Sequence, residues 1–154
     1  MTFEKATAQD TGMLTELRIA YLQEDLGKTE DADLKLIESL LPSYYEKHLN
    51  KDLMVYVVHN EKDIVSCAFL LIVENPMSPS FITGKTGTVL NVYTKPEYRK
   101  KGYAKKLMNM MLEDAKAENG SNIELKATED GYSLYRSVGF EDVAAKYYNM
   151  RISL

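Results

Sequence analysis

The amino-acid sequence predicts an α/β or α+β protein built on one β-sheet, and three observations support this prediction. Stretches of helical periodicity alternate with stretches rich in β-branched residues, most regularly in the second half of the chain. No linker, repeat or biased segment interrupts the alternation. The chain has 154 residues, 45% of them hydrophobic, which is enough for one compact domain with a buried core. We therefore expect a single domain over residues 1–154.

The first half of the chain predicts one short strand, two helical stretches and a β-hairpin. Asp10 can cap the first helix, whose apolar positions recur at helical spacing until Gly27 ends it. Pro42 should break or kink the second helix, because proline cannot donate the backbone hydrogen bond that a helix interior requires. The expected elements are a strand over residues 3–6, the helix between Asp10 and Gly27, a helical stretch from Asp33 that resumes over residues 44–49, and hairpin strands over residues 53–58 and 64–73.

The second half begins with a loop over residues 74–87, which holds Pro76 and Pro79. Residues 103–117 form the most strongly periodic helix, with an apolar face of Leu, Met and Ala side chains. The other expected elements are strands over residues 88–94 and 123–128, a short helix over residues 132–137 that Gly139 ends, and a last strand over residues 145–154.

Composition excludes several classes of protein. The net charge is −4 and the isoelectric point about 5.3, so the chain as a whole has no electrostatic reason to bind nucleic acid or an anionic membrane. The single cysteine, Cys67, cannot form an internal disulfide and lies in an apolar run, which favours a buried residue over a reactive thiol. The start lacks the apolar core of a signal peptide, and no apolar run approaches the roughly 20 residues that span a bilayer. We therefore expect a soluble, cytoplasmic protein.

The stretch RKKGYAKK, residues 99–106, is a local concentration of positive charge around Gly102. Acidic side chains are normally favoured in the first turn of a helix, because free N–H groups make that end partly positive. Here Lys105 and Lys106 occupy the first turn instead. A bound anion would remove this conflict, and Gly102 would let the backbone approach the anion closely. The stretch therefore predicts an anion site, with a merely solvated basic surface as the alternative.

Two familiar phosphate-binding motifs do not account for this stretch. Gly84-Lys85-Thr86 resembles the end of a P-loop, but Pro79 stands where that motif needs a glycine. No G-x-G-x-x-G sequence follows any predicted strand, so a dinucleotide-binding domain has no support.

Two motifs in order resemble the GCN5-related N-acetyltransferase (GNAT) family. Arg99-x-x-Gly102-x-Ala104, after a strand and at the start of a helix, is similar to the family's acyl-CoA pyrophosphate loop, Q/R-x-x-G-x-G/A. The run from Leu134 to Phe140, LYRSVGF, is similar to the family's L-Y-x-x-x-G-F signature. The resemblance implies a single mixed, mostly antiparallel sheet flanked by helices, and an acetyl-CoA-dependent N-acetyltransferase.

The resemblance also implies which residues bind acetyl-CoA. The backbone of the strand end at residues 91–94 would hold the pantetheine arm, and the main-chain N–H groups of residues 99–104 would hold the pyrophosphate. Thr128 stands where many family members have an asparagine, and its hydroxyl can still donate and accept a hydrogen bond. The implied cofactor-binding residues are Asn91, Val92, Tyr93, Thr94, Arg99, Lys100, Lys101, Gly102, Tyr103, Ala104, Lys105, Thr128 and Tyr135. No metal is expected, because no ligand cluster is visible in the sequence.

Tyr135 occupies the position of the family's usual general acid. A phenol with an ordinary pKa of about 10 can hydrogen-bond the thioester sulfur and protonate the departing CoA thiolate. The alternative is an amphipathic side chain packed at a helix edge. The motif around Tyr135 favours the catalytic interpretation.

The sequence offers several candidates for the general base and for the residues that bind the acceptor. Glu124, Glu24 and Asp25 are alternative bases, and each could equally be an ordinary surface acid. Arg18, Tyr21 and Glu24, together with the loop from residue 74, are candidates for acceptor binding. We predict acetyl transfer from acetyl-CoA to a primary amine of a small molecule or peptide by direct attack in a ternary complex, and a homodimer is compatible with this function. A non-catalytic acyl-CoA-binding module or sensor and a simple anion-binding interaction domain are the alternatives.

Overall fold

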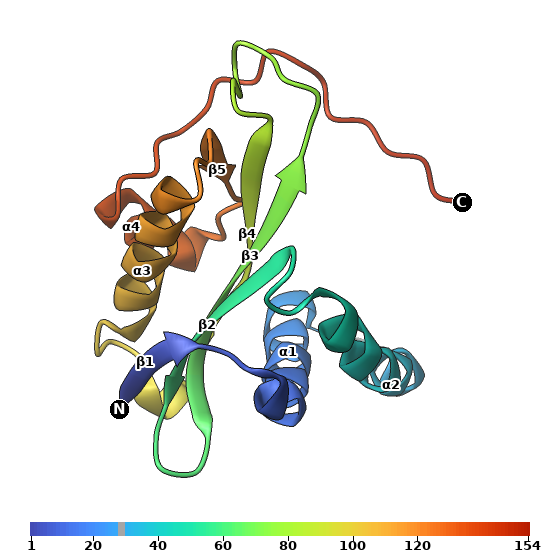
Figure 1. Ribbon diagram of the computed structural model, residues 1–154. Helices are drawn as coiled ribbons and strands as arrows, with labels where there is room; N and C mark the ends of the chain where they lie inside the picture. The colour runs from blue at the N-terminus through green and yellow to red at the C-terminus, as the bar shows by residue number, and fades with distance from the viewer. Residues whose placement is uncertain (28–29) are drawn as a thin grey trace.

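Five strands form one mixed sheet in the order β1-β2-β3-β4-β5 (Figure 1). The computed structural model describes residues 1–27 and 30–154. The first four strands pair antiparallel with their neighbours, and β5 pairs parallel with β4, which confirms the mixed, mostly antiparallel sheet. The strands are β1 (Thr2–Lys5), β2 (Leu53–His59), β3 (Ile64–Glu74), β4 (Lys85–Thr94) and β5 (Asn122–Glu124).

Helices cover both faces of this sheet (Figure 1). They are α1 (Thr11–Leu26), α2 (Asp31–His48), α3 (Tyr103–Ala117) and α4 (Glu129–Ser137), with short 3₁₀ turns at Ala8–Asp10 and Pro96–Tyr98. Because side chains alternate along a strand, β2 contributes to two separate cores. Val55 and Val57 pack with α1 and α2, whereas Tyr56 and Val58 pack with α3. Cys67 is fully buried in the first core, as predicted.

The helix α2 continues through Pro42, so the predicted break there is wrong. Leu34 and Tyr45, on either side of the proline, are both buried. The burial of both halves of the helix against the rest of the protein outweighs the one backbone hydrogen bond that the proline cannot make.

Three elements differ from the sequence prediction by three residues or more at one end. The strand β4 begins at Lys85 rather than Thr88, because its first residues pair with the end of β3 across the loop. The strand predicted over residues 123–128 is confined to Asn122–Glu124, and α4 begins at Glu129 rather than at Tyr132. The cause of the early helix start is Thr128, whose Oγ1 accepts a hydrogen bond of 3.1 Å from the N–H of Gly131 and caps α4.

The strand predicted over residues 145–154 is not formed in the structure. This segment has the alternating pattern of a strand but lies extended and exposed, away from the sheet (Figure 1). Alternating side chains suit the two faces of a strand, but a strand also needs a neighbouring strand to satisfy its backbone hydrogen bonds. This segment has the first feature and lacks the second among the described residues.

Candidate active site

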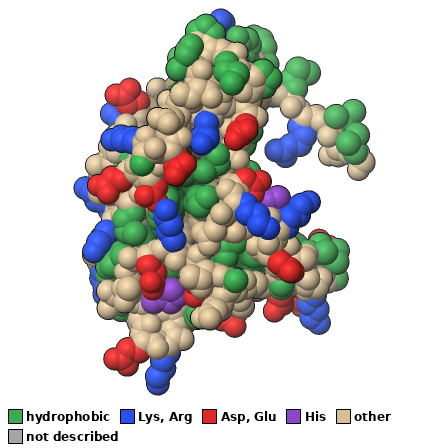
Figure 2. Space-filling model, viewed as in Figure 1, with side chains coloured by type: hydrophobic (Ala, Val, Ile, Leu, Met, Phe, Trp, Pro, Cys, Tyr) green, Lys and Arg blue, Asp and Glu red, His purple; other side chains and the backbone are tan. Residues whose placement is uncertain are grey.

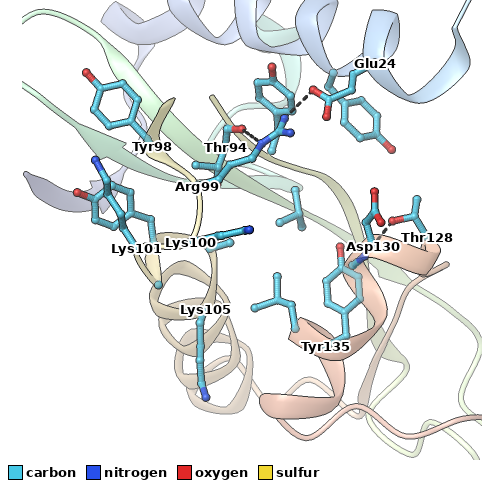
Figure 3. A pocket seen from close by; sticks show the side chains of 18 of the residues that line it. Glu24, Thr94, Tyr98, Arg99, Lys100, Lys101, Lys105, Thr128, Asp130 and Tyr135 are labelled. Atoms are coloured by element: carbon cyan, nitrogen blue, oxygen red, sulfur yellow. Dashed lines mark hydrogen bonds and ion pairs between the residues drawn. The ribbon is translucent and has the colours of Figure 1, made fainter. Parts of the chain in front are cut away.

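A cleft opens where β4 and β5 diverge (Figure 3). These strands pair only between residues 86–88 and residues 122–124, so within the described residues the rest of β4 has no strand on that side. The cleft has a volume of about 820 Å³ and is lined by the end of α1, β4, the loop that follows β4, and the first turns of α3 and α4. All of the predicted cofactor-binding residues except Asn91 line this cleft.

The loop before α3 turns its backbone toward the cleft. Lys100 and Gly102 have positive φ angles of 60° and 78°, and the first α3 hydrogen bond runs from the Lys106 N–H to the Gly102 carbonyl, at 3.1 Å. Within the described chain, no backbone acceptor takes the N–H groups of residues 100–105. Successive free N–H groups at a left-handed turn and a helix start form a concavity that suits an anion. A Cβ added at Gly102 would meet no atom of the described residues within 4 Å, so the space beside this glycine is open.

Arg99 fixes this loop against β4 and α1 (Figure 3). Its Nε donates to the Thr94 carbonyl at 2.9 Å, and its Nη2 donates to Glu24 Oε2 at 2.6 Å. The hydrogen bond with the Glu24 carboxylate raises the pKa of Arg99 above its ordinary value. The guanidinium therefore closes one wall of the cleft and is already engaged by protein groups.

The lysines of the loop differ in direction. Figure 3 shows Lys100 pointing into the cleft and Lys105 running away from it along α3. The Lys101 Nζ lies 5.1 Å from the centre of the Tyr98 ring. Of the three lysines, Lys100 is thus the one placed to add side-chain charge to the loop backbone.

Tyr135 lies across the cleft from this loop, on α4 (Figure 3). Gly139, with a φ of 107°, ends the helix, and the Phe140 N–H returns to the Tyr135 carbonyl at 3.0 Å. This turn packs the Phe140 ring edge-on against the Tyr135 ring, with 6.0 Å between ring centres. The glycine and the phenylalanine of the L-Y-x-x-x-G-F signature therefore orient the tyrosine side chain.

The Tyr135 hydroxyl is a neutral hydrogen-bond donor. Burial, and to a lesser degree the nearby Tyr21, raise the pKa of Tyr135 above its ordinary value. Its hydroxyl hydrogen-bonds none of the residues that the structure describes. A half-buried phenol with a free O–H can donate a proton to a developing anion in the cleft.

Gly131 is a site residue that the sequence reasoning missed. A Cβ at this position would lie 3.0 Å from the Tyr135 ring and 3.2 Å from Thr128 Oγ1. The glycine thus leaves room for the tyrosine ring against the capping threonine. The predicted helix begins at residue 132, so this glycine, which is unfavourable by about 1 kcal/mol inside a helix unless it has a packing reason, is recognised only once the structure places the start of α4 at Glu129.

Asn91 has its side chain outside the cleft. It is 3% exposed, and its Oδ1 accepts a hydrogen bond of 3.0 Å from Arg18 Nη1. Its Nδ2 lies 3.4 Å from the Cys67 sulfur, and burial raises the pKa of that thiol to about 12. The Asn91 side chain thus holds Arg18 of α1 against β4.

The structure separates the three candidate bases. Glu24 lines the cleft but forms an ion pair with Arg99, and Glu124 of β5 is exposed and does not line the cleft. Asp25 lines the cleft beside Tyr21, and burial together with the Asp25 carboxylate raises the pKa of Tyr21. Tyr21 also packs edge-on against Tyr93, with 6.4 Å between ring centres.

Neither a membrane span nor a metal cluster is found in the part of the chain that the structure covers. No helix over residues 1–27 and 30–154 is both long and apolar enough to cross a membrane. In the same residues, no three His, Cys, Asp or Glu side chains gather as metal ligands.

An opened sheet, a loop with free N–H groups and a tyrosine opposite it are the features expected of the acetyltransferase class of α/β proteins. The family model of the acetyltransferase (GNAT) domain matches residues 51–142 of the chain. The protein therefore belongs to the GNAT family and is an N-acetyltransferase of that type. None of the curated proteins matches the chain.

Solved structures share this fold over nearly the whole chain. A predicted acetyltransferase from Clostridium acetobutylicum, solved with acetyl-CoA, is 26% identical with a TM-score of 0.84, over 97% of this chain and 95% of its own. A GCN5-related N-acetyltransferase from Ralstonia eutropha is 20% identical with a TM-score of 0.76, over 97% of both chains. Glucosamine-6-phosphate N-acetyltransferase from Arabidopsis thaliana is 17% identical with a TM-score of 0.67, again over 97% of both chains.

Proposed function

We propose that this protein transfers an acetyl group from acetyl-CoA to a primary amine of a small molecule or peptide, by direct attack in a ternary complex. The observation that carries the proposal is the cleft itself. It joins the backbone N–H groups of residues 100–105 to a half-buried tyrosine hydroxyl, with a strand edge between them, and neither the N–H groups nor the edge has a backbone partner among the described residues.

The unpaired edge of β4 suits the pantetheine arm. The Thr94 carbonyl points into the cleft, where Arg99 binds it. Because backbone groups alternate along a strand, the N–H and C=O of Val92 point to the same side. The amide groups of the pantetheine arm can add to this edge as a further strand would, with the pyrophosphate at the loop before α3.

The chemical step needs one acid and one proton acceptor. The amine nitrogen attacks the thioester carbonyl carbon, the carbon–sulfur bond breaks, and the sulfur takes the proton of the Tyr135 hydroxyl. The amine gives up its proton to a water molecule, and a proton from solvent returns the Tyr135 phenolate to its neutral form. We assign Asp25 to orient that water, since it lines the cleft while Glu24 is held by Arg99 and Glu124 lies outside.

The test is acetyl-CoA consumption, followed as free thiol, across small amines, polyamines, amino acids and peptide N-termini. Turnover with at least one amine is the expected result. A protein that binds acetyl-CoA but releases no thiol with any of them would instead be a non-catalytic acyl-CoA sensor.

Tyr135→Phe tests the proposed acid. We expect kcat to fall by about 100- to 10,000-fold, the range typical of a lost general acid. The thermal shift produced by CoA should be unchanged, because the phenylalanine ring keeps the packing against Phe140. A parallel loss of CoA binding and rate would make Tyr135 a packing residue.

A further inference from the structure

Arg18 on α1 is a half-buried cation that forms no ion pair with the residues that the structure describes. Of its five N–H donors, one has an acceptor in residues 1–27 and 30–154, namely Asn91 Oδ1 at 3.0 Å. The face of the molecule in Figure 2 shows the usual arrangement, in which Lys and Arg side chains stand at the surface and are interspersed with Asp and Glu side chains. A guanidinium that is partly withdrawn from water without an opposite charge costs free energy, so its position needs a physical reason.

A structural tie between α1 and β4 does not account for this charge. Asn91 is 3% exposed and holds Arg18 through a neutral amide. An aspartate of almost the same shape would hold the guanidinium more strongly and would also neutralise it. Arg99 shows the contrast, because its guanidinium already has the Glu24 carboxylate as a partner at 2.6 Å. Asn91 therefore positions Arg18 and leaves its positive charge available to a ligand.

The surroundings of Arg18 suit an anion with a single charge. Its Cζ lies 5.5 Å from the centre of the Tyr21 ring. Burial raises the pKa of three nearby phenols, and the positive charge of Arg18 acts against this increase at each of them; they belong to Tyr21, Tyr44 and Tyr45. No other cation in the described part of the chain acts on these phenols. One guanidinium balances one carboxylate, which its planar N–H groups can bind in a bidentate manner, whereas a phosphate monoester would keep part of its charge unbalanced.

Arg18 and Asp25 lie on one face of α1. They are seven residues apart, which is about 700° of rotation, so their directions differ by only about 20°, and the rise between them is about 10.5 Å. Tyr21 lies between them in the sequence and lines the cleft, and Asn91 directly precedes Val92, which lines it as well. A molecule whose amine lies in the cleft beside Asp25 can therefore direct a carboxylate past Tyr21 to Arg18.

We propose that the acetyl acceptor is an amino acid, which carries its amine and a carboxylate in one molecule, and that Arg18 binds the carboxylate; this rests on the acetyl transfer proposed for the cleft. The amine nitrogen forms the amide bond while the carbon–sulfur bond breaks. The amine proton passes to water, and CoA leaves as the thiol. The carboxylate takes no part in bond making and stays with the guanidinium, so the products are an N-acetyl amino acid and CoA.

Matched acceptors test the carboxylate. Thiol release from acetyl-CoA is measured with common amino acids, each beside its carboxamide and its decarboxylated amine. The preferred amino acid should have a kcat/KM about 10- to 100-fold higher than either of these analogues, as expected for a hydrogen bond to a charged group. Equal turnover of an amino acid and its two analogues would overturn the inference, while acetyl transfer to amines would stand.

Product binding separates this inference from the proposed function, because it needs no turnover. With CoA present, an N-acetyl amino acid should raise the Tm more than the N-acetyl amine that lacks the carboxylate. A protein that shows this carboxylate-dependent shift but releases no thiol with any amine would keep the carboxylate site and lose the proposed acetyl transfer. A protein that shows neither effect would lose both.

Substitutions of Arg18 should act on the acceptor alone. Arg18→Gln should raise the KM for the amino acid about 10- to 100-fold and leave the KM for acetyl-CoA unchanged. Arg18→Lys should recover part of this loss, because it restores the charge without the planar fork. Lys35→Gln removes one positive charge from an exposed position on α2 and should leave both KM values unchanged. An Arg18→Gln protein that uses the amino acid as well as wild type does would contradict the assignment.

Asn91→Asp distinguishes a ligand-binding arginine from a structural tie. The new carboxylate would pair with Arg18, so the Tm should be kept or raised. It would also compete with the acceptor carboxylate for the guanidinium, so the KM for the amino acid should rise to about that of Arg18→Gln. If the folded Asn91→Asp protein keeps the wild-type KM for the amino acid, Arg18 only ties α1 to β4 and the inference fails.

Discussion

Replacing Gly102 with alanine should remove most of the binding of acetyl-CoA while leaving the protein folded. Gly102 has a φ of 78° and precedes the first turn of α3. A left-handed residue with a Cβ costs roughly 1–2 kcal/mol, which is small beside a typical folding stability of about 5–15 kcal/mol. The added methyl group meets no atom of residues 1–27 or 30–154 within 4 Å, and because Gly102 lines the cleft, the methyl group projects into the space proposed for the pyrophosphate.

The loss of binding can be measured as a smaller CoA-induced shift in Tm, from thermal unfolding with and without CoA. A ligand at about 100 times its Kd stabilises the native state by about 2.7 kcal/mol. For a chain of this size, 1 kcal/mol corresponds to about 2–4 °C in Tm, so the wild-type shift should be about 5–11 °C. If the methyl group weakens binding about 100-fold, the same CoA concentration stabilises by only about 0.4 kcal/mol, a shift of about 1–2 °C.

Gly27→Ala is the matched control. Gly27 also has a positive φ, of 66°, and open space around its Cβ position, but it lies at the end of α1. This variant should lower the Tm through backbone strain and keep the CoA shift. A Gly102→Ala protein that unfolds cooperatively and retains the full shift would refute the assignment of the loop to the pyrophosphate.

Three further predictions follow from contacts that the structure shows. Gly131→Ala puts a methyl group 3.0 Å from the Tyr135 ring, so kcat should fall by about 3- to 10-fold without loss of Tm, whereas Gly12→Ala in open space on α1 should leave kcat unchanged. Burial would raise the pKa of Asp10, but the Thr7 N–H, at 2.7 Å, and His59, at 2.9 Å, outweigh it and lower that pKa below its ordinary value of 3.8. A carboxyl group whose pKa is lower in the folded than in the unfolded protein stabilises the fold at pH values above its unfolded pKa. This stabilisation is lost as the pH falls through the folded pKa. Asp10→Ala should therefore cost about 1–3 kcal/mol at pH 7, and the difference from wild type should narrow below about pH 4; a gap that stays constant with pH would contradict this. Arg18→Ala should raise the acceptor KM at saturating acetyl-CoA, because Arg18 is held toward β4 by Asn91. Glu24→Ala should chiefly raise the KM for acetyl-CoA, because it frees Arg99. The reverse pattern in steady-state kinetics would overturn both assignments.

The loop and the tyrosine could be predicted from the sequence because each is encoded within a few consecutive residues. Gly102 favours a left-handed turn at the start of a helix. The run from Leu134 to Phe140 contains the end of a helix, the glycine that ends it and the aromatic contact that orients Tyr135. The roles of the surrounding side chains could not be predicted in this way. Arg99 meets Glu24 across 75 residues of sequence, and Arg18 meets Asn91 across 73.

The sequence by itself thus determined the order of the elements from β1 to α4, the mixed sheet implied by the family resemblance, and the local geometry on which the proposed acyl-CoA binding depends. The tertiary structure decided that Arg99 is engaged by Glu24 and that the Asn91 side chain points away from the cleft. It also decided that the C-terminal segment has no partner within its own chain among the described residues. The physical reason is the range of the interactions. Backbone conformation and helix ends depend on near neighbours in the sequence, whereas ion pairs, strand partners and the direction of a buried amide depend on how α1 and the sheet edges come together in space.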